Sequence, residues 1–267
     1  MPQTDYLSIN KKSWNNKVET HVNSEFYDME NFRKIQNSLN SIELNLLPDL
    51  TGKTVLHLQC HFGQDSISLS KLGAKVVGVD LSDKAIDTAK KLAEELHADA
   101  EFICCDIYNL PNHLNEQFDY VFSSYGTIGW LPDINLWASI VSKYLKPKGQ
   151  FIFAEFHPVV WMFDDNFTHI QYPYTSSEAI QESETGTYAD KNADLEQEYV
   201  MWNHGLSEVM GNLIKHSLTI THFSEYDYSP YNCFNGAVEF EPKKYRVKTL
   251  GNKIPMVYAL VATKNLI

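Results

Sequence analysis

The sequence has few cysteines and no long apolar run. Its four cysteines are Cys60, Cys104, Cys105 and Cys233, and no two of them form a Cys-x-x-Cys pair. This spacing argues against a zinc site and against a disulfide framework, so we expect no bound metal. No run of about 18 consecutive apolar residues occurs, which argues against a membrane-spanning helix. The N-terminus also lacks the basic and then apolar pattern of a secretory signal, so we expect a cytoplasmic protein.

Positive charge is scarce as well. The 22 Lys and Arg residues are outnumbered by 34 Asp and Glu residues, which gives a formal net charge of −12. A phosphate backbone would be repelled by such a protein unless basic residues cluster locally. The one dense basic run, at 243–248, is interpreted as a solvated strand or loop. We therefore expect neither nucleic acid nor a membrane as a partner.

Residues 53–154 alternate short apolar runs with amphipathic segments, a pattern typical of a parallel sheet covered by helices. Between the second and third runs, Ser82 is a candidate N-cap for a helix with apolar residues at helical spacing. The predicted strands are Thr54–Leu58, Lys75–Asp80, Ala100–Cys105, Phe118–Ser123 and Gln150–Glu155. The core is predicted to span residues 45–156 and 205–267, ending in a helix at 206–215 and an antiparallel pair of late strands, Leu218–Tyr226 and Ile254–Thr263.

Two segments flank this alternation. Residues 1–44 contain apolar residues that suggest one or two helices after a polar stretch around Trp14, and we interpret the segment as a lid. Residues 157–204 are rich in Tyr, Thr, Ser and acidic residues, and are interpreted as a β-rich cap insertion. Its strand-like pieces are His169–Thr175 and Leu195–Trp202.

The sharpest local motif is a strand at 55–58 followed by a tight loop that ends at Gly63. An acidic residue, Asp80, follows 17 residues later at the end of the next strand. A strand, a loop, a helix and such a carboxylate form a nucleoside-binding arrangement, in which the carboxylate accepts hydrogen bonds from ribose hydroxyls. The alternative is that Asp80 serves only as a negative charge near a helix N-terminus.

The motif resembles the first motif of the class I methyltransferases, which usually reads as a strand, an acidic residue and then Gly-x-Gly-x-Gly. Here the residues are His57-Leu58-Gln59-Cys60-His61-Phe62-Gly63, so His57 replaces the acidic residue, and Gln59 and His61 replace two glycines. Residues other than glycine at such a turn must tolerate positive φ, or the loop must differ slightly.

Three further segments fit the same family in order. Asp106 directly follows the third strand, residues 118–126 resemble the fourth motif, and residues 145–150 resemble the turn into the fifth strand. The resemblance implies a Rossmann-like α/β fold with a seven-stranded, mostly parallel sheet, helices on both faces and an antiparallel C-terminal strand. It also implies S-adenosylmethionine as the methyl donor and S-adenosylhomocysteine (SAH) as the product. The predicted cofactor-binding residues are Gln59, Cys60, His61, Gly63, Asp80, Leu81, Asp106, Ile107, Ser123 and Trp14.

Two other functions remain open from the sequence. A nicotinamide-dependent oxidoreductase expects Gly-x-Gly-x-x-Gly, but the corresponding residues are Gln59, His61 and Gln64. The second alternative is a non-catalytic sensor that binds adenosylmethionine or a nucleotide. It remains open because the loop after the first strand departs from the usual motif.

Methyl transfer from a sulfonium is an in-line displacement, so alignment matters more than a fixed set of catalytic groups. The residues 123–126 lack the Pro-Pro-aromatic motif of enzymes that methylate base amino groups, which together with the acidic composition favours a small-molecule acceptor. The candidate catalytic residues are Tyr125 and His157, the latter at the end of the fifth strand. His157 is either a proton acceptor or a structural residue that fixes the exit into the cap, and Glu155 shares both possibilities.

Overall fold

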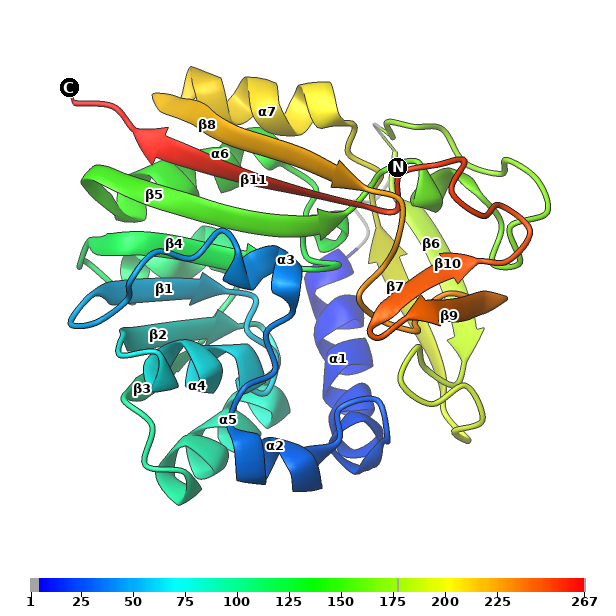
Figure 1. Ribbon diagram of the computed structural model, residues 1–267, viewed down its shortest axis with the longest axis horizontal. Coiled ribbons are helices and arrows are strands. Elements are labelled where there is room, and N and C mark those ends of the chain that lie inside the picture. Colours follow the sequence, from blue (N-terminus) through cyan, green and yellow to red (C-terminus); the bar gives the residue numbers. More distant parts are fainter. Residues whose placement is uncertain (1–4, 177, 267) are drawn as a thin grey trace.

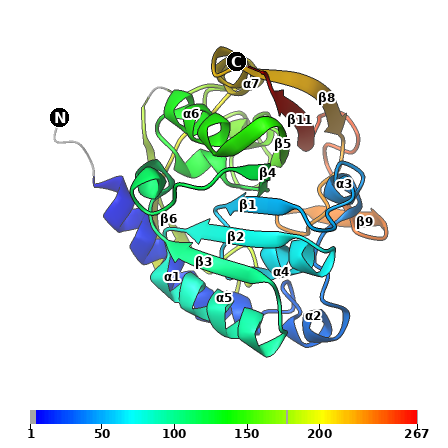
Figure 2. The same cartoon turned by 90° about the vertical axis from the view of Figure 1, so that its left-hand side faces the viewer.

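A seven-stranded sheet forms the centre of the computed structural model, which describes residues 5–176 and 178–266 (Figures 1 and 2). The strand order is β3-β2-β1-β4-β5-β11-β8. Strands β3, β2, β1, β4 and β5 are parallel to one another, and β11 is antiparallel to both β5 and β8. The bounds are β1 Thr54–Leu58, β2 Lys75–Asp80, β3 Ala100–Cys104, β4 Phe118–Ser124, β5 Leu145–Phe156, β8 Leu218–Tyr226 and β11 Val257–Lys264.

Helices cover both faces of this sheet (Figure 2). Alternate residues of β1 face opposite sides: Leu56 packs in a cluster with Trp137 of α6, whereas Val55 packs with Leu69 of α4. Burial of both faces accounts for the nearly continuous apolar character of the parallel strands. On one face lie α4 (Gln64–Lys71) and α5 (Asp83–Glu95), and on the other lie α6 (Ile134–Tyr144), α7 (Leu206–Lys215) and the short 3-10 helix η1 (Ile107–Asn112).

The predicted Rossmann-like fold is confirmed. Strands β1 and β2 have the predicted bounds, and the other predicted strands of the sheet agree to within a few residues, except that β5 starts earlier. Helix α5 begins as expected after Ser82, whose Oγ accepts a hydrogen bond from the backbone N of Ala85 at 3.0 Å.

The N-terminal segment is more helical than expected. The polar stretch around Trp14 is part of α1 (Tyr6–Asn23), which is followed by α2 (Met29–Ile35) and α3 (Ser41–Leu44). The buried side of α1 carries Asn10, Ser13 and Lys17, so the helix lacks the apolar period by which sequence analysis finds a helix.

The predicted strand at His169–Thr175 is wrong. That stretch is irregular apart from one isolated bridge, in which Ile170 pairs with Phe163. The second predicted piece is confirmed as β7 (Glu196–Met201), which pairs with β6 (Ile180–Thr185). A further two-stranded sheet, β9 (Ala237–Glu241) with β10 (Lys244–Val247), lies in the long connection between β8 and β11 and was not predicted.

Helix α1 and the β6–β7 sheet together form a layer beyond the carboxyl ends of β1 and β4, which we call the roof (Figure 1). Asn10 of α1 makes two hydrogen bonds with the backbone of Val200 in β7, at 2.8 and 2.9 Å. At its other side α1 contacts α5, where Lys11 forms an ion pair with Asp83 at 3.0 Å. In the part of the chain that the structure describes, no helix is both long and apolar enough to cross a membrane.

Candidate active site

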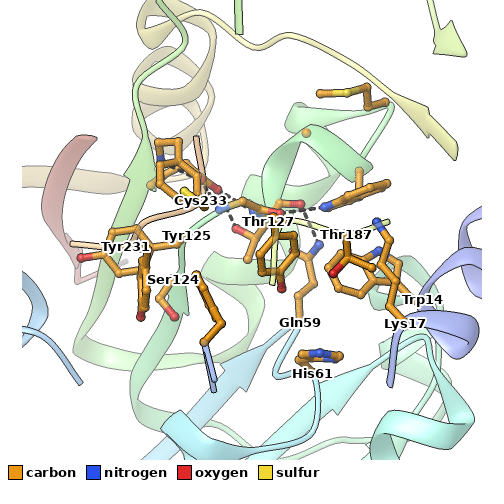
Figure 3. A pocket seen from close by; sticks show the side chains of 18 of the residues that line it. Trp14, Lys17, Gln59, His61, Ser124, Tyr125, Thr127, Thr187, Tyr231 and Cys233 are labelled. Carbon is orange, nitrogen blue, oxygen red and sulfur yellow. Dashed lines mark hydrogen bonds between the residues drawn. The ribbon is translucent and has the colours of Figure 1, made fainter. Parts of the chain in front are cut away.

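A cavity of about 960 Å³ lies beneath the roof, at the carboxyl ends of the central strands (Figure 3). Ligands of open parallel sheets bind at this edge, because the loops that follow neighbouring strands meet there. In Figure 3, His61, Trp14 and Lys17 lie at one end, which we call the loop end, and Ser124, Tyr125 and Tyr231 lie at the other, the tyrosine end. Gln59 and Thr127 lie between the two ends and are joined by a hydrogen bond from Gln59 Nε2 to the Thr127 carbonyl at 2.7 Å.

The loop after β1 keeps a left-handed backbone without its usual glycines. Gln59 and His61 have φ of 56° and 50°, and Gly63 has φ of 84°. Left-handed backbone costs about 1–2 kcal/mol in a residue with a Cβ atom. Gly63 itself is required, since an added Cβ would lie 2.9 Å from the side chains of Ala89 and Phe102. The loop therefore has the turn that the resemblance implied, built from different residues.

Asp80 fixes this loop from the end of β2. Its Oδ2 accepts a hydrogen bond from the backbone N of His61 at 2.8 Å, and its Oδ1 accepts one from the backbone N of Ser82 at 2.8 Å. Burial raises the pKa of Asp80, and these backbone contacts oppose the rise. A carboxylate has about four acceptor positions, so two remain for hydroxyl donors in the cavity.

The remaining strand-end residues of the prediction line the same cavity. Leu81 follows Asp80, and Cys60 lies in the loop. Asp106 caps η1, with Oδ1 accepting a hydrogen bond from the backbone N of Tyr108 at 3.3 Å, and Ile107 lies beside it. Burial raises the pKa of Asp106.

Trp14 reaches the loop end from the roof. Its ring centroid lies 5.2 Å from that of His61 and 5.2 Å from that of Trp130. His61 Nε2 lies 3.0 Å from Nδ1 of His21, another residue of α1. Burial lowers the pKa of His61 to about 3 and that of His21 to about 2, so both imidazoles are neutral at pH 7.

Two buried polar atoms of the loop have no hydrogen-bond partner within residues 5–176 and 178–266, namely Gln59 Oε1 and His61 Nδ1. An unpaired buried polar atom costs about 1–3 kcal/mol. Both atoms belong to residues that line the cavity, so a polar ligand bound there would remove this cost.

Lys17 connects the two parts of the roof. Its Nζ lies 2.8 Å from Oε1 of Glu184 in β6, and only 3% of the lysine side chain is exposed. The same Nζ lies 5.1 Å from the centroid of Trp14, and 5.6 Å from those of Trp130 and Tyr199. Burial lowers the pKa of Lys17, and the charge of Glu184 opposes this. The ion pair holds α1 against the cap over the loop end.

The tyrosine end has two carboxylates behind its aromatic rings. The Tyr125 hydroxyl donates to Oε2 of Glu43 at 2.7 Å, and the ring of Tyr125 meets that of Tyr231 edge to face, with centroids 5.2 Å apart. Asp65, in the first turn of α4, accepts hydrogen bonds from Ser38 Oγ at 2.5 Å and from Ser124 Oγ at 3.0 Å. Burial, followed by the charge of Asp65, raises the pKa of Glu43 to about 7.

Two predicted site residues lie outside the cavity. The Ser123 side chain points away because neighbouring residues of a strand face opposite sides, and its Oγ donates to Oγ1 of Thr127 at 3.1 Å. Ser124 takes its place in the cavity lining. His157 is buried against β8, with Nε2 2.9 Å from Oε1 of Glu225 and Nδ1 accepting from the backbone N of Val159 at 3.2 Å. Its structural alternative therefore fits the geometry, and the proton-acceptor role does not.

Glu155 also has a structural environment. Its carboxylate accepts hydrogen bonds from the backbone N atoms of Gly126, Thr127 at 2.7 Å and Ile128 at 3.2 Å. It thereby fixes the turn that follows β4, including the start of the 3-10 helix η2 (Ile128–Trp130). Burial raises the pKa of Glu155, and these backbone donors oppose the rise.

Four residues of the site were not predicted from the sequence, namely Lys17, Glu43, Asp65 and Tyr231. Asn40 and Glu43 have capping-box spacing, which identifies a helix start but not a partner at Tyr125. Asp65 has the sequence pattern of an ordinary acidic residue in a first helical turn. Nothing in the local sequence marks Lys17 as buried or Tyr231 as lining the cavity.

Comparisons with known proteins agree with this geometry. Residues 55–149 match the family model of the methyltransferase domain. This stretch of the chain is thus similar to methyltransferase domains. The matched region runs from β1 to the start of β5, and so includes the loop, Asp80 and Asp106.

Curated relatives match part of the chain. A ubiquinone biosynthesis O-methyltransferase of Coxiella burnetii is 33% identical over 105 residues, which are 39% of this chain and 44% of that protein. The chain spans about half the length of the curated relatives that it matches, from 44% to 61%.

Two solved structures have a similar fold over most of the chain. A putative S-adenosylmethionine-dependent methyltransferase of Listeria monocytogenes has a TM-score of 0.59 at 21% identity, covering 84% of this chain and 96% of that one. The magnesium protoporphyrin IX methyltransferase of Synechocystis, solved with bound SAH, has a TM-score of 0.58 at 16% identity, covering 98% and 100%.

Proposed function

We propose that this chain is an enzyme that transfers a methyl group from S-adenosylmethionine to a small-molecule acceptor by in-line displacement. The observation that carries the proposal is the loop end, where a left-handed turn, the Asp80 carboxylate and Asp106 surround one cavity at the ends of β1, β2 and β3. The volume of about 960 Å³ lies at the upper end of the usual range for ligand sites, so donor and acceptor fit together.

The residues of the loop end match the polar groups of the donor. Asp80 has free acceptor positions for ribose hydroxyls, and Asp106 lies where an adenine amino group is held in this family. Gln59 Oε1 and His61 Nδ1 are the buried atoms that the amino-acid part of the donor would satisfy. When bound, S-adenosylmethionine supplies an electrophilic methyl group on a sulfonium.

The chain contributes alignment and the exclusion of water. Trp14, Trp130 and the neutral pair of His61 with His21 surround the loop end with weakly hydrated rings. We propose that residues 1–44 act as a lid and that residues 157–204 act as a cap, which close together over the bound donor. Their ion pair between Lys17 and Glu184 and the contacts of Asn10 with Val200 support this role. Closure keeps water from the sulfonium.

Calorimetry with SAH tests binding, and formation of SAH from S-adenosylmethionine with pooled small metabolites tests catalysis. We expect binding of SAH and turnover with at least one fraction of the pool. Binding without turnover in any fraction would favour a non-catalytic sensor. Tight binding of NADH with no binding of SAH would contradict the proposal altogether.

A further inference from the structure

The tyrosine end of the cavity has two carboxylates, Asp65 and Glu43, whose partners are hydroxyl and backbone N–H groups. Asp65 accepts hydrogen bonds from the hydroxyls of Ser38 and Ser124, and Glu43 accepts them from Tyr125 and Asn40. Within the described ranges, no Lys or Arg forms an ion pair with either carboxylate. Removing a carboxylate from water without a cation is costly, and a hydroxyl donor compensates only in part.

The charge of Asp65 acts on three titratable groups near it. Burial raises the pKa values of Glu43, Tyr125 and Tyr231, and the charge of Asp65 adds to each rise. In each case the negative potential favours the protonated form. The same potential favours a cationic group of a ligand over a neutral or anionic one.

The walls of this end are aromatic. Tyr231 packs against Tyr125 at 5.2 Å and stacks on Phe26 at 5.5 Å, and all three residues line the cavity. Aromatic faces attract cations by about 0.5–2 kcal/mol, more strongly where water is excluded. A site with a carboxylate and tyrosine rings therefore has two independent features that select a positive charge.

We propose that the methyl acceptor is an amine that is protonated in solution, and that it binds at the tyrosine end through Asp65, Tyr125 and Tyr231. The inference rests on the proposed methyltransferase function and names the class of its acceptor. The proposed acceptor site includes Glu43 from the segment 38–43 and Tyr231 from the connection between β8 and β11. Both segments lie outside the family-matched residues.

An ammonium must lose a proton before its nitrogen can attack. The Tyr125 hydroxyl passes its proton to the Glu43 carboxylate while its oxygen takes one from the ammonium, so that the net proton transfer is from nitrogen to Glu43. A base with a pKa of about 7 is suited to this step. The nitrogen lone pair then forms a bond to the methyl carbon, the carbon–sulfur bond breaks, and its electron pair remains on the sulfur. The products are a methylated ammonium, the thioether SAH and a protonated Glu43.

The experiment compares three water-soluble probes of similar shape in calorimetry with the SAH-bound full chain. These are 2-phenylethylamine, which is cationic, 2-phenylethanol, which is neutral, and phenylacetate, which is anionic. We expect the amine to bind at least about tenfold more tightly than the alcohol, since a charge-assisted contact contributes about 1.5–3 kcal/mol. Asp65→Asn should reduce this preference to within about threefold, and Asp99→Asn, which removes an exposed carboxylate at the opposite edge of the sheet, should leave it unchanged.

Three results would overturn the proposal. The first is a lack of preference for the amine, in which 2-phenylethanol binds as tightly as 2-phenylethylamine or the amine does not bind at all. Another is an Asp65→Asn variant that loses affinity for SAH about tenfold or more while the preference for the amine persists, since Asp65 would then hold the amino group of the donor. The third is a wild-type chain that binds the amine without SAH but never binds SAH, which would contradict the proposed function and leave an amine-binding protein in its place.

Discussion

The two ends of the cavity differ in where their residues lie along the chain. Apart from Trp14 and Lys17 of α1 and from Trp130, the loop end is built from residues 59–107, in which the polar residues lie at or just after the end of a strand. The tyrosine end combines Ser38 and Glu43, Asp65, Tyr125 and Tyr231, which belong to four separate segments. The first end is thus a local motif, whereas the second exists only after the chain has folded.

This difference suggests a division of labour. A strand, a loop and a carboxylate at fixed spacing suit a donor that many related enzymes share, and this part matches the family model. The acceptor differs from one enzyme to another, and its proposed site combines Asp65 and Tyr125 of the matched region with segments outside it, at 38–43 and 227–256. If this view is right, substitutions at the two ends should affect different properties.

The largest expected effect concerns Glu43 at the tyrosine end. Burial and the charge of Asp65 raise its pKa from 4.5 to about 7 in the folded chain, so the folded state binds the proton more tightly than the unfolded state. This contribution to stability is fully present below about pH 4.5 and is lost as the pH rises through about 7, a change of about 3 kcal/mol. Glu43→Gln removes the ionisation.

Chemical denaturation at about pH 5 and about pH 8 measures this effect. Relative to the wild type, Glu43→Gln should become more stable at the higher pH by up to about 3 kcal/mol. The exposed Glu94→Gln on α5 is the matched control and should show no such change. If the difference in stability between variant and wild type does not vary with pH, the pKa of Glu43 is not raised in the folded chain.

The second effect concerns Asp80 at the loop end. Asp80→Ala removes the proposed acceptor of the ribose hydroxyls and the contact with the His61 backbone, so SAH should bind about 10- to 100-fold more weakly. Binding of 2-phenylethylamine should persist in this variant if the two ends are separate. Asp87→Ala, which removes an exposed carboxylate on the helix α5 that follows β2, serves as the control. Unchanged affinity for SAH in a folded Asp80→Ala chain would exclude Asp80 from the donor site.

The contrast between local motifs and contacts of distant segments also explains which parts of the fold could be predicted from the sequence. Strands β1 and β2, the helix after Ser82 and the placement of Asp80 and Asp106 followed from apolar runs and local spacing. Helix α1 was missed because its buried side carries Asn10, Ser13 and Lys17. These polar residues are satisfied by β6 and β7, which lie more than 150 residues away along the chain, and such pairings leave no local pattern.

A third prediction tests whether the roof closes over the donor. Hydrogen exchange with and without SAH should show added protection in Asn10–Val22, by about tenfold if closure is stabilised by about 1.4 kcal/mol. Lys17→Met should weaken that protection, because it removes the ion pair with Glu184 across the roof. Lys12→Met, on the exposed side of the same helix, should not. Protection confined to the loop at 59–63 would mean that the roof does not respond to the donor.

The smallest effect on activity is expected at His157, although sequence analysis predicted it as a catalytic residue. Its imidazole faces Glu225 and the backbone N of Val159, and the residue does not line the cavity. Burial lowers the pKa of His157, and Glu225 opposes this, so the ring serves mainly to hold the end of β5 against β8. His157→Ala should therefore lower the free energy of unfolding by about 1–3 kcal/mol, through the loss of buried hydrogen bonds. Once an acceptor is found, turnover of the folded variant should stay within about threefold of the wild type, because no proton transfer depends on this residue.

His113→Ala, at an exposed site, should change neither the free energy of unfolding nor turnover. A loss of turnover of about 100-fold with unchanged stability would instead require the β5 end to rearrange when ligands bind, bringing His157 into the cavity.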